Sequence, residues 1–135
     1  MIFPEPLPLA SSWALSERRE RIDSWMPSAD TVGGRWSFDL STGEMAWDRA
    51  IYELFGFPPH EQLSRRSAVD CYVGESRCAM EQLRAHAIAH RRGFTLDVDI
   101  APANGEPVRR IRLSAAPVCV GHRAVALEGV KQLLR

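Results

Sequence analysis

Two histidines, His86 and His90, have a spacing that could support metal chemistry. They stand four residues apart in a stretch with helical periodicity, so both side chains would project from one helix face and could ligate one metal ion. The sequence offers no third ligand at a recognisable spacing, so it does not predict a zinc site. The alternative interpretation is that both are surface residues beside the arginines of the same stretch, Arg84, Arg91 and Arg92.

The cysteines and the motif content point away from catalysis. Three cysteines, Cys71, Cys78 and Cys119, form an odd set without a CxxC pair, which predicts free thiols in a reducing compartment and small, semi-buried side chains. The sequence contains no GxSxG, P-loop, HExxH or glycine-rich dinucleotide motif. We therefore expect a protein that is not an enzyme.

The composition bounds the class of protein. A length of 135 residues suits one domain, and 45% hydrophobic with 25% charged residues is typical of a globular protein. The 17 basic residues balance the 17 acidic ones, which argues against nucleic acid or an acidic membrane as partner and leaves little repulsion against self-association. No apolar run approaches the roughly 20 residues of a membrane span, and the start lacks a signal-peptide pattern, so we expect a cytoplasmic protein.

The stretch from residue 34 to 60 organises the rest of the chain. Residues 35–40 alternate between apolar and polar side chains, which predicts a half-buried strand, and a turn with Gly43 leads to a second short strand. Asp48 is expected to cap a helix over residues 49–55. Gly56 is expected to end that helix before Pro58.

The first 31 residues are predicted to form a separate leader, with the folded domain at residues 32–135. A proline-rich arm at residues 2–9 is followed by an amphipathic helix from Ser11 or Ser12 to about Trp25. Two interpretations of the helix stay open: it packs on its own domain, or it pairs with a second copy. The interface residues in the second case are Trp13, Leu15, Ile22 and Trp25.

One long helix and three strands are predicted after the opening stretch. Residues 77–92 carry an apolar stripe at helical spacing, whereas residues 94–101, 108–120 and 124–133 alternate as strands, with Pro117 marking a bulge or an edge. Together with the two early strands this pattern predicts an α+β domain: a five-stranded antiparallel sheet with helices on one face.

The chain resembles a PAS domain of the subgroup that opens with a Gly-x-Trp-x-x-Asp strand. The resemblance rests on Gly34, Trp36 and Asp39, followed by residues 42–44, Trp47, residues 52–57 and Pro59, and it covers about residues 32–135. It implies the strand order 2-1-5-4-3 and a leading helix at a dimer contact. The family's closing Gly-x-x-x-Asp-Ile-Thr is replaced here by Gly129-Val130-Lys131-Gln132 and residues 133–135.

The resemblance also implies a space between helices and sheet. Its lining would suit a small hydrophobic ligand, or would simply form a filled core, which we favour. Some PAS domains hold haem through a histidine of the long helix, which makes His86 or His90 the residue for that alternative; otherwise we expect no cofactor. The residues expected around the space are Ile51, Leu54, Leu83, Ala87, Leu96, Val98, Leu113 and Leu127.

The function that the resemblance implies is a sensory or protein-interaction module of bacterial signal transduction. It would act without catalysis, by dimerisation or by binding a signalling partner such as a histidine kinase. The alternative is a small-ligand or haem sensor domain that belongs to a larger histidine kinase or cyclic-dinucleotide enzyme.

Overall fold

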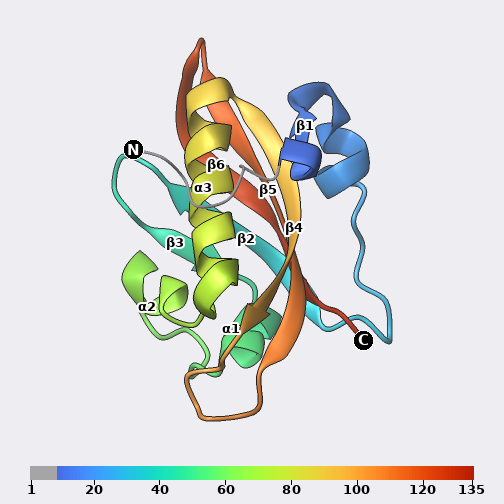
Figure 1. Ribbon diagram of the computed structural model, residues 1–135, viewed down its shortest axis with the longest axis vertical. Helices are drawn as coiled ribbons and strands as arrows, with labels where there is room; N and C mark the ends of the chain where they lie inside the picture. Colours follow the sequence, from blue (N-terminus) through green and yellow to red (C-terminus); the bar gives the residue numbers. More distant parts are fainter. Residues whose placement is uncertain (1–8) are drawn as a thin grey trace.

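The computed structural model, which describes residues 9–135, is built around a single antiparallel sheet (Figure 1). Its strand order is β1-β4-β5-β6-β2-β3. When β2 to β6 are counted as strands 1 to 5, the order read from β3 to β4 is 2-1-5-4-3, so the predicted arrangement is confirmed. Strand β1 is an additional edge strand. The strands are β1 (Ser12–Ala14), β2 (Gly33–Asp39), β3 (Met45–Trp47), β4 (Arg92–Ile100), β5 (Arg109–Val120) and β6 (Arg123–Leu133).

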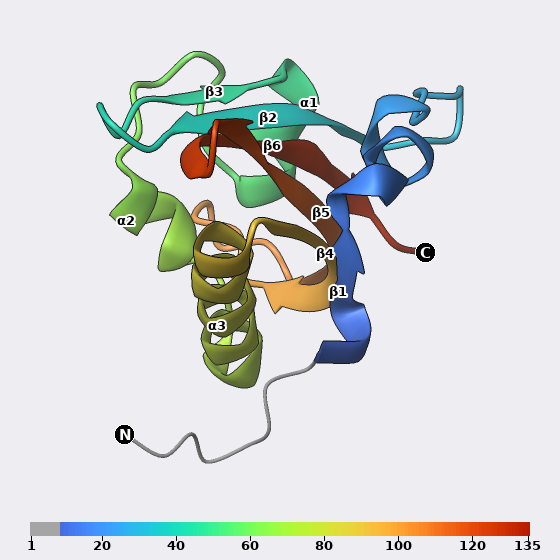
Figure 2. The ribbon, with the colours of Figure 1, turned by 90° about the horizontal axis from the view of Figure 1, so that it is seen from above.

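Three helices connect β3 to β4. They are α1 (Arg49–Phe55), α2 (Arg65–Val69) and α3 (Gly74–His90). Figure 2 shows α2 and α3 on one side of the sheet and the N-terminal segment on the other. Gly56 ends α1 in the left-handed conformation at φ +74°, as predicted, because glycine has no Cβ to oppose it. The longest helix, α3, begins three residues earlier than predicted.

The prediction that the Asp48 side chain caps α1 is wrong. Asp48 stands at the N-cap position, but its side chain makes no cap hydrogen bond. Its Oδ2 atom instead accepts the backbone N–H of Arg35 at 2.7 Å. The carboxylate therefore ties the start of α1 to β2, which fixes the helix against the sheet that it covers.

The prediction of a continuous amphipathic helix from Ser11 or Ser12 to Trp25 is also wrong. The segment consists of 3₁₀ turns at Leu9–Ser11 and Leu15–Glu17, strand β1 between them, and a π-type turn at Arg19–Asp23. Tertiary contacts outweigh helical propensity, because β1 pairs with the edge of β4, where Trp13 lies opposite Gly93. A Cβ at Gly93 would collide with the indole ring, so the glycine makes room for the tryptophan.

Two hydrophobic clusters lie on opposite faces of the sheet. The inner cluster, between the sheet and the helices, contains most of the buried apolar side chains, among them Ile51, Leu83 and Val98. The outer cluster is small and joins Trp13 and Ile22 of the N-terminal segment to Ala116 and Val130 of the sheet. The sheet is thus covered on both sides by parts of the same chain.

The predicted extended arm at residues 2–9 lies outside the described residues except for its last position. Within residues 9–135, no helix has the length and apolar character needed to cross a bilayer. The predicted irregularity near Pro117 is confirmed as a bulge, because the pairing of β5 with β6 shifts between Val118 and Cys119.

Candidate functional site

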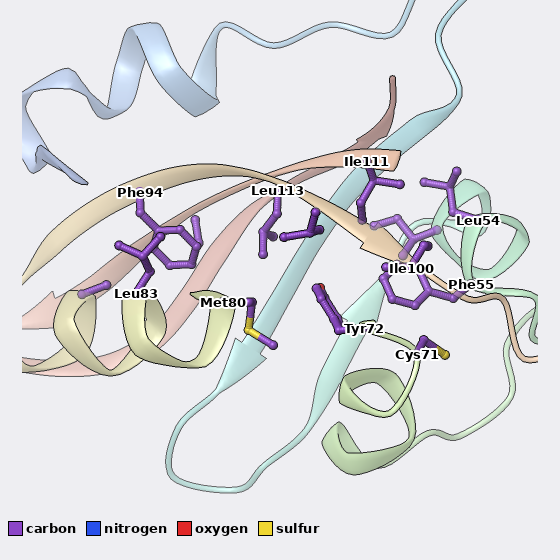
Figure 3. Close-up of a cluster of buried hydrophobic side chains, with 14 residues drawn as sticks. Leu54, Phe55, Cys71, Tyr72, Met80, Leu83, Phe94, Ile100, Ile111 and Leu113 are labelled. Atoms are coloured by element: carbon purple, nitrogen blue, oxygen red, sulfur yellow. The ribbon is translucent and has the colours of Figure 1, made fainter. Parts of the chain in front are cut away.

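A cavity lies between the inner face of the sheet and helices α2 and α3. It offers about 60 Å³ to the centres of water-sized molecules, within an empty space of about 520 Å³ that includes solvent at its mouth. Figure 3 shows Tyr72, Met80 and Leu113 around this part of the core. Its walls are mostly aromatic and aliphatic, with three cationic side chains among them. The lining residues are Trp36, Ser37, Phe38, Met45, Trp47, Arg65, Ala68, Val69, Tyr72, Met80, Arg84, Phe94, Leu113, Leu127 and Lys131.

Lys131 of β6 is buried in this lining, with 6% of its surface exposed. Its Nζ atom lies over four aromatic rings, from α1, β2, β3 and the α2–α3 connection. The distances to the ring centroids are 4.8 Å for Phe55, 5.0 Å for Trp47, 5.1 Å for Trp36 and 6.0 Å for Tyr72. Such ring faces attract a cation through their quadrupoles. We call these four rings the aromatic cage.

Lys131 has no acidic partner among the residues that the structure describes. None of the ion pairs within residues 9–135 includes it. Burial lowers the pKa of its ammonium group to about 7, and the Arg65 guanidinium adds to this lowering, while Cys71 opposes it. The cage also favours the charged form and opposes the shift. Burial thus makes the ammonium form of Lys131 less favourable than it is in water.

Two arginines extend the positive character of the cavity wall. The Arg84 guanidinium carbon lies 5.2 Å from the ring centroid of Phe38, and burial together with repulsion from Arg65 lowers the pKa of Arg84 to about 10. Arg65 forms an ion pair with Glu81 of α3, and its side chain is about one third exposed. Its neighbour Arg66 is exposed, whereas Arg65 lines the cavity.

The wall also contains a hydrogen-bond donor without a partner. The Nε1 atom of Trp36 is buried and makes no hydrogen bond within residues 9–135. A buried donor left in this state carries a desolvation cost of about 1–3 kcal/mol. Together with Lys131, it means that β2 and β6 present donors at the cavity for which the described chain supplies no acceptor.

The arrangement of strands and helices matches solved structures. No protein-family model matches the sequence. The PAS domain of a protein from Colwellia psychrerythraea has a TM-score of 0.62 at 14% identity, with 89% of this chain and 96% of that chain covered. The chain has the PAS fold. The N-terminal domain of a diguanylate cyclase with PAS/PAC sensor from Marinobacter aquaeolei gives 0.64 at 16% identity, with 73% and 92% covered.

One curated protein is similar in sequence to part of this PAS-fold chain. It is the probable diguanylate cyclase DgcE of Escherichia coli (strain K12), which is 28% identical over 82 residues. The similarity covers 61% of this chain and 7% of that protein. The chain thus corresponds to a small part of this relative, and the fold predicted from the Gly-x-Trp-x-x-Asp opening is confirmed.

The predicted ligand-binding residues divide into two groups in this PAS fold. Leu113 and Leu127 line the cavity, as expected. Ile51, Leu54, Leu83, Ala87 and Val98 are buried in the inner cluster, and Leu96 packs against it, but none of the six lines the cavity. They form the packed part of the core, so their role as ligand contacts stays a prediction.

The two histidines lie away from the cavity. Their rings contact each other at an interplanar angle of 41° with centroids 4.5 Å apart, His90 is exposed, and neither lines the cavity. Desolvation, with the charges of His90 and Arg92, lowers the pKa of His86. Within residues 9–135, no group of three or more His, Cys, Asp or Glu side chains is placed to hold a metal ion. The geometry does not fit a haem bound in the PAS cavity through either histidine.

The predicted interface residues contact the chain's own sheet. Trp13 and Ile22 are 3% and 1% exposed within the outer cluster, and Leu15 and Trp25 pack at its edge. The Nε1 atom of Trp13 donates to Thr95 Oγ1 at 3.0 Å, and that of Trp25 donates to Gln132 Oε1 at 2.8 Å. An interface through these four residues stays a prediction, and it would require the segment to leave the sheet.

Sequence reasoning missed Lys131 as a site residue. The signal was present in the alternation of β6, because Leu127, Lys131 and Leu133 share one face of a strand whose side chains point alternately to the two sides. Leu133 packs against the inner cluster and the buried Leu127 lines the cavity, so a lysine between them must also point inward. A charged residue at a core position of a strand is the pattern that would have identified the site.

Proposed function

We propose that this chain is a non-catalytic sensory module in which the state of the inner cavity is passed through β6 to the N-terminal segment. From there it would reach a signalling partner or a second copy of the chain. The mostly aromatic and aliphatic lining of the cavity suits binding rather than bond-making chemistry. The PAS fold, found in a sensor domain and in other solved PAS structures, supports the same class of function.

A single observation carries the proposal: three consecutive residues of β6 connect the inner cavity with the N-terminal segment on the outer face. Lys131 faces the aromatic cage. Its neighbour Val130 belongs to the outer cluster, and Gln132 accepts the hydrogen bond from Trp25. A shift of β6 that follows a change at Lys131 would therefore alter the two contacts that hold the N-terminal segment on the sheet.

The partner would be a signalling protein. The similarity to part of a probable diguanylate cyclase supports a cyclic-dinucleotide enzyme as the protein that such a module would serve, and a histidine kinase is the other class. A homodimer is the third arrangement. In it, Trp13 and Ile22 would leave the outer cluster and pair with the same residues of a second copy, because their combined apolar surface needs a cover.

The test combines mass and exchange measurements on the full chain. Native mass spectra of the purified protein should show either added mass that is lost on denaturation or twice the chain mass. Trp25→Phe removes the hydrogen bond to Gln132 but keeps a ring, so it should speed amide hydrogen exchange in residues 12–25 and raise the dimer fraction. Arg66→Gln, at an exposed position, is the matched control.

The proposal would be overturned by a combination of two results. The first is a single-chain mass without added mass for both the unchanged protein and Trp25→Phe. The second is exchange in residues 12–25 that is the same in Trp25→Phe as in the unchanged protein. In that case the segment would be a fixed part of the domain and would carry no signal.

A further inference from the structure

The three cations of the cavity have an unequal supply of counter-charge. Among the residues that line the cavity, Arg65, Arg84 and Lys131 are positive, and none is acidic. Arg65 is paired with Glu81, which is outside the lining. Arg84 and Lys131 take part in none of the ion pairs within residues 9–135 and rest on aromatic rings instead. Two unneutralised cations thus face a mostly apolar space.

Burying positive charges together without an anion is energetically unfavourable. Lys131 and Arg84 lose hydration, and each is repelled by Arg65 in a region of low dielectric. The lowered pKa values of Arg84 and Lys131 reflect this cost. An anion in the cavity would relieve it, and the unpartnered N–H of Trp36 could donate to the same anion.

We infer that the cavity binds a small organic monoanion, a carboxylate on a short apolar body, with the carboxylate between Lys131 and Arg84. The inference rests on the proposed sensory function and names its ligand class. The apolar body would lie against the rings of Trp36 and Trp47, which line the same space. A hydrophobic ligand without charge would leave both cations without a partner.

The volume limits the size of the ligand. A space of about 60 Å³ for the centres of water-sized groups admits a ligand of only a few non-hydrogen atoms. A carboxylate with a chain of three or four carbons is of this size. Butyrate is therefore the probe, with butyramide and butanol as neutral analogues of similar shape and butylamine as the cationic analogue.

The affinity for butyrate should depend on pH. The ammonium form of Lys131 is the binding form, so affinity is greatest below the pKa of about 7 and falls as the pH rises above it. The other ionisable groups near Lys131 keep their protonation states through this pH range. Arg65 and Arg84 stay protonated, and burial raises the pKa values of Cys71 and Tyr72, which stay neutral.

The experiment is a titration of the full chain with each probe, followed by amide and indole chemical shifts in NMR spectra. Butyrate should shift the indole N–H signals of Trp36 and Trp47 and bind at least tenfold more tightly than butyramide or butanol, whereas butylamine should not bind. Lys131→Met keeps most of the length of the side chain but removes its charge, and it should weaken butyrate binding at least tenfold. Arg84→Gln should weaken it about threefold to tenfold, and Arg66→Gln should leave it unchanged.

The outcomes separate the ligand class from the sensory function. If butyramide or butanol binds in the cavity as tightly as butyrate, the inference of an anionic ligand is overturned, while the proposal of a ligand-responsive module stands. The same conclusion follows if Lys131→Met and Arg66→Gln bind butyrate equally. If no probe binds and native spectra show dimers, the anion is overturned and the interaction function stands. Arg84→Gln, at a partly exposed position, provides the test should Lys131→Met fail to fold.

Discussion

The two faces of the sheet are covered by the same chain in different ways. The inner face packs against α1 and α3 through many fully buried aliphatic and aromatic side chains. The outer face is covered by the short, irregular N-terminal segment. The cluster between segment and sheet contains four buried residues of the described chain, and the indoles of Trp13 and Trp25 each donate a hydrogen bond to the sheet. Because hydrophobic stabilisation scales with buried apolar area, the inner contact should hold the fold together and the outer contact should open at a smaller cost.

The inner face nevertheless contains the less favourable group. Lys131 is buried among rings and has no acidic partner in the described part of the chain, whereas charges near the N-terminal segment, such as Arg18 and Glu128, are paired at the surface. Arg35 also donates to the carbonyl oxygens of Ile22, Asp23 and Trp25 and so satisfies the end of the segment. The more stable inner face thus contains an unfavourable buried charge. On the less stable outer face the polar groups are paired, but the buried apolar area is small. Three measurements would break or sharpen this comparison.

Leu83→Ala should have the largest effect. Leu83 is fully buried at the centre of α3, so removing its side chain leaves a cavity in the inner cluster. The free energy of unfolding should fall by about 3 kcal/mol, measured by urea denaturation. Hydrogen exchange should accelerate in α3 and in β4 and β5 together. A loss below about 1 kcal/mol would contradict the assignment of the inner cluster as the main source of stability.

Ile22→Ala makes a similar truncation on the outer face. The global free energy of unfolding should fall by about 1–2 kcal/mol, less than for Leu83→Ala, because the segment can detach before the domain unfolds. Residues 12–25 should exchange through a local opening whose free energy is lower than that of α3, and both openings should become easier in Ile22→Ala. Equal opening free energies in the two regions would show that the N-terminal segment and the domain unfold as one unit.

The pH dependence of stability reports on Lys131. Its pKa is lowered in the folded state, so the unfolded chain binds more protons above pH 7 and stability rises with pH. From pH 7 to pH 8.5 the gain should be about 1.5 kcal/mol by urea denaturation. The window ends before the thiol of Cys71, with its raised pKa, begins to oppose the trend. In Lys131→Met the rise should disappear; a rise that persists would assign it to another group.

Much of the fold could be predicted from local patterns. Alternation gave the three late strands, and Gly56 marked the end of α1, because these signals depend on neighbouring residues alone. The N-terminal segment could not be predicted, since its helical spacing competes with strand pairing to a residue stretch far away in the sequence: β1 pairs with β4, about eighty residues away. Local propensity is a weak prior wherever such a partner exists.

The candidate site was predicted only in its aliphatic part. Leu113 and Leu127 are expected at the cavity through the PAS resemblance, but the cations are not, because Arg65 lies on a short helix whose orientation no local pattern fixes. The aromatic cage joins residues from α1, β2, β3 and the α2–α3 connection, so its convergence on Lys131 is a property of the folded topology. Only the inward position of Lys131 itself could be read from the alternation of β6.

The bulge between Val118 and Cys119 has a consequence for how the chain avoids a misaligned sheet. A one-residue slip of β6 would turn Lys131 to the outer face, away from the aromatic cage, and bring Val130 or Gln132 inward. The sheet therefore needs markers that penalise the slip. The bulge is one, and Gly129 is another, because a Cβ at that position would collide with the carbonyl oxygen of Ser114. These two features keep the alignment that holds a lysine where a slipped sheet would release it.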